Sequence, residues 1–327
     1  MTRVIIKTPS RLHMALIDLN GSLGRIDGGV GIALERPQVT LEAELIDVGI
    51  LVEGDDDGRT FEVANMVLKN YGLKGGVHIR VLEKYDKHVG LGFGTQLSLA
   101  TAFSIAKLHG ICTSPRELAK VVGRGGTSGI GVAAFETGGM IIDGGHTFGQ
   151  DRQKQSFLPS SASKAPPAPV ISRLDFPEDW SIVLATPKKN QKIHGSLEVE
   201  LFSKHCPVPI SEVQALSHII LMKLLPSVVI KDVTEFGEAV SLIQKIGFKK
   251  VELNLQSEIV KEIMAAMVGT GAYGVGLSSF GPTLYTVVDS AKKAKAIAKA
   301  AEDRMKETGG KVLITKANNK GAEVSII

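Results

Sequence analysis

The spacing of apolar residues in the first half of the chain predicts strands and helices in alternation. Residues 60–71 predict a helix, and residues 95–108, which are small and apolar on nearly every side, predict a buried one. Ser114-Pro115-Arg116-Glu117 predicts a further helix start, with Ser114 as the cap, Pro115 in the first turn and Glu117 at the third position. The strands expected in this half cover residues 3–7, 39–48, 77–82 and 139–143.

The second half begins with a change of composition. Between Gln150 and Pro169 the chain is rich in Ser, Ala, Lys and Pro, which predicts an extended, exposed segment or a long loop. A strand is expected over residues 180–186, a strand pair near residues 273–288, and two short strands at the end. The expected helices cover residues 196–205, 209–225, 234–246, 256–268 and 290–307. We place a domain boundary near residue 175 and predict an α+β fold for both domains.

The length and charge of the chain narrow the class of protein. A chain of 327 residues suffices for two domains, and 43% apolar and 22% charged residues are typical of a globular protein. The net charge is only +4, and much of the basic excess lies in the predicted helix 290–307, whose alanines and Ile297 supply an apolar face. That pattern favours a solvated helix face over a nucleic-acid patch. Aromatic residues make up 5% with one Trp, so we expect no nucleic-acid partner.

The cysteines and the apolar segments bear on the compartment. Cys112 and Cys206 lie far apart and form no C-x-x-C pair, so we expect reduced thiols and neither a disulfide framework nor a zinc site. The N-terminus predicts a strand and lacks the apolar core of a signal peptide. The most apolar long segment, residues 213–230, is interrupted by Lys223 and Pro226, which argues against a membrane span. We therefore expect a cytoplasmic protein without membrane contact.

The 36 glycines cluster in short runs, and three of these runs carry the donors that an anion needs. Residues 89–97 lead directly into the predicted buried helix, so free N–H groups and the helix dipole would meet at one point, as in a phosphate site. Residues 123–131 add a guanidinium and two hydroxyls, and residues 274–283 form a hydroxyl-rich glycine turn. A tight turn is the alternative for any single run. The G-x-G-x-x-G string at 269–274 follows a helix and precedes a strand, which is the reverse of the dinucleotide fingerprint.

Together these loops resemble the motifs of the GHMP kinase superfamily. Thr8-Pro9-Ser10-Arg11-Leu12-His13 is similar to the first motif, Gly90–Gln96 to the second, which is the phosphate loop, and Gly276–Thr283 to the third. The resemblance implies a two-domain α+β fold with the site between the domains. Residues 1–175 would form a GHMP-type N-terminal domain that carries the phosphate loop and resembles domain 2 of ribosomal protein S5, and residues 176–327 would form a ferredoxin-like C-terminal domain.

Two departures from the kinase pattern argue against phosphoryl transfer. The phosphate loop ends in Phe93-Gly94-Thr95-Gln96, where the kinases usually have Ser-Ser-Ala or a close variant. Gly131 stands where many of the kinases have the Asp that acts as base on the substrate hydroxyl, and a glycine cannot accept a proton. Some kinases of the superfamily manage without this Asp, so an ATP-dependent small-molecule kinase stays open as the alternative.

Longer strings resemble one branch of the superfamily, the β-ribofuranosylaminobenzene 5′-phosphate synthases. These strings are Ser10–His13, Leu16–Gly21, Gly24–Gly29, Gly123–Phe135, Asp143–His146, His194–Phe202 and Cys206–Pro209. The resemblance implies a decarboxylating phosphoribosyltransferase of tetrahydromethanopterin biosynthesis. It would join the ribosyl phosphate of phosphoribosyl diphosphate to C1 of 4-hydroxybenzoate or 4-aminobenzoate and release CO2 and diphosphate. We also expect Mg²⁺ as cofactor, no partners other than these small-molecule substrates, and assembly as a homodimer.

The implied chemistry assigns expected roles to residues of these strings. Departure of diphosphate leaves positive charge on the sugar carbon, so the site needs cations for the leaving group and a carboxylate near that carbon. The expected phosphate and substrate ligands are Arg11, Arg25, Gly90, Gly92, Gly94, Thr95, Gln96, Arg124, Thr127, Ser128, Ser278 and Ser279. The expected catalytic residues are Asp18, Asp27, His13 and His194, with His146 as a further candidate base, and the expected metal ligands are Asp18 and Glu198. The alternative is a turn cap for each Asp and a hydrogen-bonded structural side chain for each His.

Overall fold

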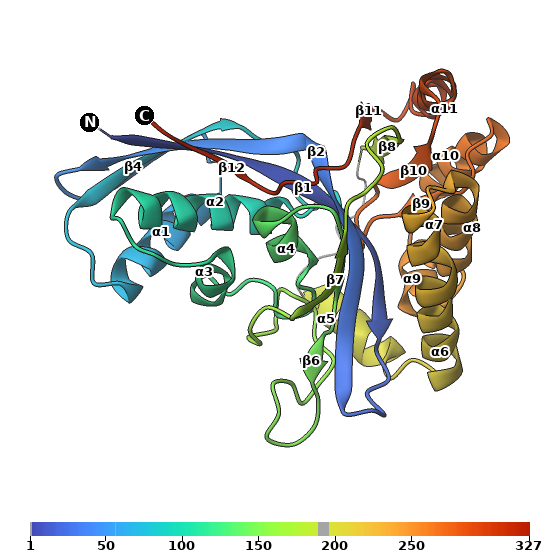
Figure 1. Cartoon of the computed structure of the whole chain (residues 1–327), viewed down its shortest axis with the longest axis horizontal. Helices are drawn as coiled ribbons and strands as arrows, with labels where there is room; N and C mark the ends of the chain where they lie inside the picture. Colours follow the sequence, from blue (N-terminus) through green and yellow to red (C-terminus); the bar gives the residue numbers. More distant parts are fainter. Residues whose placement is uncertain (1, 56, 189–195) are drawn as a thin grey trace.

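The computed structural model describes residues 2–55, 57–188 and 196–327, and it divides the strands between two sheets. The larger sheet is built on two long antiparallel strands, β1 (Arg3–Asp18) and β2 (Arg25–Ile46), which bend downward together through the middle of the molecule in Figure 1. One end of this sheet is completed by β3 (Ile50–Glu53), β4 (Gly76–Glu83) and β12 (Glu323–Ile326). The other end is completed by β5 (Met140–Asp143), β6 (His146–Thr147) and β7 (Val170–Leu174).

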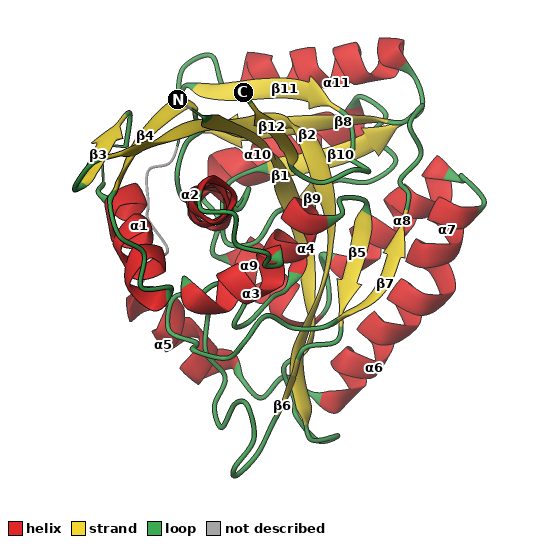
Figure 2. Ribbon diagram, turned by 60° about the vertical axis from the view of Figure 1, so that its left-hand side comes forward, coloured by secondary structure: helices red, strands yellow, loops and turns green. Residues whose placement is uncertain are grey.

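Helices cover one face of the larger sheet. They are α1 (Arg59–Asn70), α2 (Phe93–Leu108), α3 (Pro115–Val121) and α4 (Ile130–Glu136). The helix α2 lies at the centre of this layer, and Figure 2 looks nearly along its axis. Most residues of α2 are buried, as its uniformly small and apolar sequence predicts. The expected capping box at the start of α3 is confirmed, because Ser114 and Glu117 each accept the other's backbone N–H.

The smaller sheet lies in the second half of the chain. Its order is β11 (Gly310–Thr315), β8 (Ser181–Pro187), β10 (Leu284–Val288) and β9 (Gly276–Leu277), all antiparallel. The helices α10 (Glu258–Gly269) and α11 (Ala291–Arg304) pack on it around Ile263 and Ile297. The remaining helices are α5 (Ser196–His205), α6 (Ile210–Ile219), the π-helical η1 (Ile220–Leu224), α7 (Leu225–Val229), α8 (Val233–Ile243) and α9 (Gly247–Asn254).

One apolar core joins the two halves. Leu12 and Met14 of β1 belong to the same buried cluster as Trp180, Phe236 and Tyr285 of the second half. The expected boundary near residue 175 falls between β7 and β8, where the chain leaves the larger sheet for the smaller one. The last strand, β12, then returns to pair with β1, so the ends of the chain lie close together in Figure 1. The two halves of the chain are therefore interlocked.

The apolar segment of the second half forms a surface helix. Within the described residues, Ile210–Val229 is the helical stretch that is long and apolar enough to cross a membrane. One side of it packs into the core through Leu216, Ile220, Leu224 and Val228. Lys223, on another side, pairs with Glu238 of α8 at 2.7 Å. This amphipathic arrangement is that of a helix lying on a protein core.

Candidate active site

A pocket of about 290 Å³ opens where the N-terminus of α2 meets the second half of the chain. One wall comes from the first half, with Arg11, Arg59 and Arg124 around the loop that precedes α2. The other comes from the second half, with Glu198 of α5 and Phe280 of the third glycine turn. The lining is rich in cations and backbone N–H groups, so the pocket is suited to an anionic ligand.

The glycines of the first loop allow a close approach between the two halves. Gly90 and Gly92 have φ values of 88° and 81°, in the left-handed region that favours glycine. A Cβ on Gly90 would stand only 2.1 Å from the carbonyl oxygen of Ser278. Ser278 also donates its hydroxyl to the carbonyl of Gly90 at 2.7 Å. The phosphate-loop resemblance and the third-motif resemblance thus meet at one point, and the first amides of α2 lie at the pocket.

Two guanidinium groups converge over the first turn of α2. A Cβ on Gly94 would lie 3.3 Å from Nη1 of Arg59 and 3.7 Å from Nη2 of Arg124. The Nε atoms of both arginines are buried and have no hydrogen-bond partner among the described residues. Buried donors without a partner are costly, and here they lie beside the positive end of a helix dipole. Both arginines line the pocket, and the arrangement suits an anionic ligand.

Arg11 links the pocket to a buried polar cluster between the halves. Its guanidinium donates to the carbonyl of Gly90, and the two-residue period of β1 places His13 on the same strand face. Burial lowers the pKa of Arg11 to about 10, opposed by the charges of Tyr85 and Glu252, so the side chain stays cationic near neutrality. Burial, assisted by the charges of Arg11 and Lys249, lowers the pKa of His13 well below its usual value. Neither ring nitrogen of His13 has a hydrogen-bond partner among the described residues.

The opposite side of this cluster comes from α9, which the sequence did not predict. Lys249 and Glu252 form a buried ion pair one helical turn apart, and Lys249 also donates to the carbonyl of Leu277 at 3.1 Å. Burial lowers the pKa of Lys249 and raises that of Glu252, and the charges of Arg11 and of the pair itself modify both pKa values. The i, i+3 spacing of a Lys and a Glu is too common on solvated helices to have revealed this pair.

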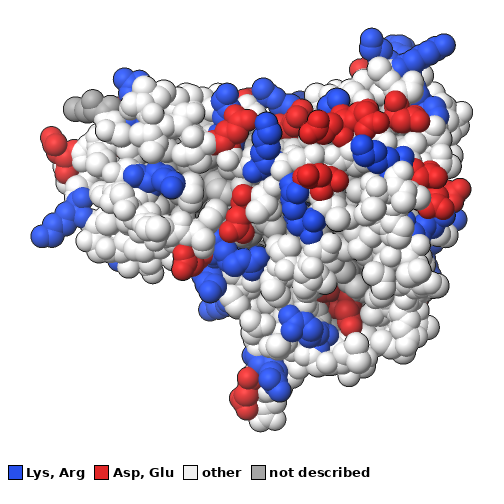
Figure 3. Space-filling view, in the orientation of Figure 1, with Lys and Arg blue, Asp and Glu red and all other residues white. Residues whose placement is uncertain are grey.

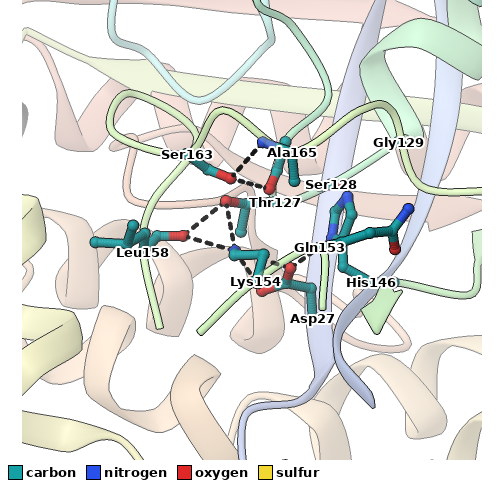
Figure 4. A network of polar contacts seen from close by, with 12 residues as sticks. Asp27, Thr127, Ser128, Gly129, His146, Gln153, Lys154, Leu158, Ser163 and Ala165 are labelled. Atoms are coloured by element: carbon teal, nitrogen blue, oxygen red, sulfur yellow. Dashed lines mark hydrogen bonds and ion pairs between the residues drawn. The ribbon is translucent and has the colours of Figure 1, made fainter. Parts of the chain in front are cut away.

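Asp27 and Thr127 lie in a different network, which Figure 4 shows. Asp27 is fully buried with φ 69°, and its carboxylate accepts from Nδ1 of His146 at 2.6 Å and from Nζ of Lys154 at 2.9 Å. Thr127 donates its hydroxyl to the carbonyl of Leu158 at 2.7 Å. None of these residues lines the pocket. Asp27, Thr127 and the candidate base His146 are therefore hydrogen-bonded interior groups in this structure.

Ser128 belongs to the same buried region. Its hydroxyl donates weakly to Asp143 at 3.4 Å, and the backbone N–H groups of Gly129 and Gly145 donate to that carboxylate at 2.9 and 3.0 Å. Burial raises the pKa of Asp143 to about 6, although these two N–H groups act in the opposite direction. Asp143 was not among the predicted site residues, and the string Asp143-Gly144-Gly145-His146 was its only signal.

Asp18 and Arg25 lie at the β1–β2 hairpin and also do not line the pocket. Asp18 accepts from the backbone N–H groups of Asn20 and Gly21 at 2.8 and 3.0 Å, which is the geometry of a turn cap. Arg25 donates to the carbonyls of Gly144 and Gly145 at 2.7 and 3.0 Å. Their expected roles beside the sugar stay predictions.

Of the remaining expected residues, some line the pocket, one is buried away from it, and one lies outside the part of the chain that the structure describes. His194 lies outside the described residues. Gln96 is buried and donates to the carbonyl of Gly131 at 2.8 Å. The predicted residues that line the pocket are Arg11, Gly90, Gly92, Gly94, Thr95, Arg124, Glu198 and Ser279. The structure adds Phe93, Phe280 and Gly281, which lie within the second and third motifs, and four residues outside all the motifs that the sequence analysis missed: Arg59, Lys87, His88 and Ser161.

Arg59 is the most consequential of the missed residues. It is the first residue of α1, directly after the N-cap Gly58. Acidic residues usually occupy the first turn of a helix, because they complement the dipole. An arginine at that position was therefore a weak signal that an anion, and not the helix itself, is its partner.

The lining also bears on magnesium. Glu198 is the carboxylate that lines the pocket within the described residues, and it accepts from the hydroxyl of Ser161 at 3.2 Å. No group of three or more His, Cys, Asp or Glu side chains suited to a metal occurs in the described part of the chain. Such a donor set fits Mg²⁺ only as it is usually bound with phosphates, through one or two carboxylates while the substrate supplies other ligands.

Fold and pocket together define the class of protein. The models for the GHMP kinase N-terminal domain and the GHMP kinase C-terminal domain match residues 59–139 and 221–307. The structure superposes on homoserine kinase from Cytophaga hutchinsonii with a TM-score of 0.71 at 17% identity, covering 99% of this chain and 97% of that one. It superposes equally on phosphomevalonate kinase from Streptococcus pneumoniae, with a TM-score of 0.71 at 13% identity, covering 97% and 100% of the two chains. The predicted GHMP-kinase fold is confirmed.

Closer relatives define the family. The chain is 46% identical to beta-ribofuranosylphenol 5'-phosphate synthase from Methanothermobacter thermautotrophicus, over 98% of each chain. It is 47% identical to the synthase of the same name from Methanocaldococcus jannaschii, over 98% of this chain and 100% of that one. The chain belongs to the beta-ribofuranosylphenol 5'-phosphate synthase family and is an enzyme of the pentosyltransferase type. Kinases are distant by comparison: homoserine kinase from Methanococcus maripaludis is 24% identical over 54% of the chain.

Proposed function

We propose that the enzyme transfers the ribosyl phosphate of phosphoribosyl diphosphate to C1 of 4-hydroxybenzoate, in tetrahydromethanopterin biosynthesis. The family name specifies a phenol as the ribosylated product. Loss of CO2 from 4-hydroxybenzoate leaves a phenol, whereas 4-aminobenzoate would leave an aniline. Of the two acceptors expected from the sequence, the hydroxylated one is therefore supported.

In this reaction the C–O bond between the sugar carbon and the diphosphate breaks, and the diphosphate leaves with the electron pair. The ring carbon that bears the carboxylate attacks the oxocarbenium-like sugar carbon and forms the C–C bond. The carboxylate then leaves as CO2, and its electron pair restores aromaticity. The para hydroxyl assists by releasing electron density toward the attacking carbon.

The convergence of Arg59 and Arg124 over the N-terminus of α2 is the observation that carries this proposal. Paired guanidinium groups with free N–H groups of a helix match the oxygens of a diphosphate. They act most strongly on the diphosphate as it departs, because its charge increases in the transition state. Arg11, held on the carbonyl of Gly90, adds a further positive charge at the pocket.

Magnesium would strengthen the same interaction. When bound, Mg²⁺ would neutralise negative charge on the diphosphate leaving group. Glu198 is the pocket carboxylate that would help to hold it, while the predicted contribution of Asp18 lacks support from the pocket lining. The predicted role of His13 as a base also lacks support from the pocket lining, and its lowered pKa makes the imidazole a weak proton acceptor.

We further propose that the enzyme works as a homodimer in the cytoplasm. Leu221, Met222, Val229 and Ile230, on or directly after the surface helix 210–229, are between 63% and 65% exposed, and a second copy would cover them. Both cysteines are free, which suits a reducing compartment.

Acidic and basic side chains lie side by side on the face shown in Figure 3, which favours small-molecule substrates over a nucleic acid. Light scattering of the parent and of Met222→Glu tests the dimer, since the charge should shift the protein toward monomer.

The reaction is tested by incubating the protein with phosphoribosyl diphosphate, Mg²⁺ and carboxyl-labelled 4-hydroxybenzoate. We expect release of labelled CO2 that requires phosphoribosyl diphosphate and stops when magnesium is chelated. Parallel assays with 4-aminobenzoate measure the acceptor preference. Folded protein that releases no CO2 from either acceptor, or that turns over ATP instead, would overturn the proposal.

A further inference from the structure

Lys154 is a buried ammonium in a segment that its composition predicts to be exposed. Residues 150–169, here called the strap, are a long coil, as predicted, but the strap is anchored in the interior at several points. Lys154 is one of the anchors, and its side chain is only 3% exposed. A charged group is rarely buried this completely unless each of its donors is satisfied.

The contacts of Lys154 satisfy it fully. Its Nζ donates to both carboxylate oxygens of Asp27 at 3.2 and 2.9 Å, to the carbonyl of Leu158 at 3.2 Å and to the hydroxyl of Thr127 at 3.4 Å, as Figure 4 shows. Thr127 in turn donates to the same carbonyl of Leu158 at 2.7 Å. One ammonium thus joins strand β2, the glycine run 123–131 and the strap.

Two of these three segments carry residues of the pocket. Arg124 precedes Thr127 by three positions in the glycine loop, and Ser161 follows Leu158 by three positions in the strap. A second bond holds the same pair of segments together, because Ser163 donates its hydroxyl to the carbonyl of Gly126. The positions of Arg124 and Ser161 relative to each other therefore depend on the contacts of Lys154 together with the bond from Ser163 to Gly126.

His146 adds two further contacts to this network. His146 contacts Asp27 through Nδ1 at 2.6 Å and the carbonyl of Pro166, at the far end of the strap, through Nε2 at 2.8 Å. The carboxylate of Asp27 thereby connects to both ends of the strap, through Lys154 and through His146. Since Asp27 is fully buried and does not line the pocket, its influence on the ligand must pass through these contacts.

We propose that Asp27 and Lys154 are positioning residues, which hold Arg124 and the strap in the geometry that grips the diphosphate. The inference rests on the proposed function, because it presumes an anion at the end of α2. It assigns to Asp27 a role at a distance from the sugar, and to Lys154 a role in a pocket that its side chain does not reach.

The test removes both charges together, because a single buried charge left without its partner would destabilise the fold. Lys154→Met retains the length of the side chain. Asp27→Asn tolerates the left-handed backbone at φ 69° and can still accept from His146. The exposed pair Lys299 and Asp303 of α11 provides a matched control, Lys299→Met with Asp303→Asn. Thr127→Val, which removes one hydroxyl from the network, is a milder second variant for the case that the double variant does not fold.

The readouts are calorimetric binding of inorganic diphosphate with Mg²⁺, and KM for phosphoribosyl diphosphate. We expect the double variant to bind diphosphate about tenfold or more weakly, the range typical of a lost supporting contact, with kcat reduced less than affinity. The control should bind like the parent. Thr127→Val should weaken binding in the same direction but less.

A double-mutant cycle separates positioning from simple destabilisation. In an Arg124→Met background the pair should have a smaller effect on diphosphate affinity than in the parent, because the guanidinium that it positions has already been removed. Two results would overturn the positioning role and leave the proposed function intact. One is full additivity of the pair with Arg124→Met, and the other is parent-like diphosphate affinity in both the double variant and Thr127→Val. Failure of the parent itself to bind diphosphate would overturn the proposed function, and the inference with it.

Discussion

The guanidinium of Arg59 lies directly over Gly94, so close that a Cβ on that glycine would stand 3.3 Å from Nη1. Arg59 begins α1 and Gly94 is in the first turn of α2. The start of one helix thus supplies a cation to the start of the next, where backbone N–H groups already favour an anion. Much of the chemistry that we expect of the pocket depends on this contact.

Gly94→Ala tests the contact with a single methyl group. We expect the melting temperature to stay the same or rise, because alanine favours a helix over glycine by up to about 1 kcal/mol. The Arg59 side chain must shift to make room, so KM for phosphoribosyl diphosphate should rise several-fold. Gly269→Ala, at the end of α10 with no atom near the added Cβ, is the matched control. An unchanged KM in Gly94→Ala would show that the position of Arg59 is not critical.

Arg59→Met removes the guanidinium but keeps an apolar stem. Hydrogen bonds to charged groups contribute roughly 1.5–3 kcal/mol each, so diphosphate affinity should fall about tenfold to hundredfold. Arg59→Lys should recover only part of this loss, because an ammonium lacks the planar fork. Calorimetry with inorganic diphosphate gives the measurement, and Arg304→Met, in the last turn of α11, controls for loss of one positive charge. Equal affinity in Arg59→Met and Arg304→Met would exclude Arg59 as a ligand.

Asp18→Asn distinguishes the turn cap from an electrostatic role in the reaction. An amide oxygen can accept the same bonds from Asn20 and Gly21, so we expect the melting temperature of the parent. If the charge of Asp18 stabilises the sugar cation or the metal, as the sequence predicts, turnover should fall roughly a hundredfold. Asp18→Ala, which loses the cap as well, should lower stability by about 1 kcal/mol. If folded Asp18→Asn turns over at the parent rate, Asp18 has only the structural role of a turn cap.

Asp143 should make the stability of the protein depend on pH. Burial raises its pKa to about 6 in the folded state, above the usual value of 3.8. Between these two pH values the folded protein binds more protons than the unfolded one. The stabilisation of the folded state that comes from protonated Asp143 is therefore complete below about pH 4 and is lost as the pH rises through 6. Asp143→Asn, which carries no titratable group, should lack this slope in urea titrations between pH 4 and 6. An identical slope in both proteins would assign the dependence to other groups.

The sequence by itself predicted helices and glycine turns, because both depend on local residues, but it predicted only residues 3–7 and 39–48 of the long strands β1 and β2. The small apolar residues of 95–108 predicted a buried helix, and that helix is α2. Gly90 and Gly92 predicted a loop whose backbone amides approach an anion, and the structure shows in addition that Gly90 lies against Ser278. The helix α9 escaped prediction, because its eight residues include Lys249 and Glu252, which resemble an exposed face.

Only the tertiary structure decided which charged side chains reach the pocket. Asp27 and Arg124 belong to sequence strings that were both assigned to the same site. In the structure Asp27 is buried against Lys154, while Arg124 lines the pocket. Arg59 carried almost no sequence signal, and it lines the pocket. Helix and turn formation depend on neighbours a few residues away, which a sequence displays. The partner of a buried charge comes from a distant part of the chain, and it is known only when the fold brings the two together.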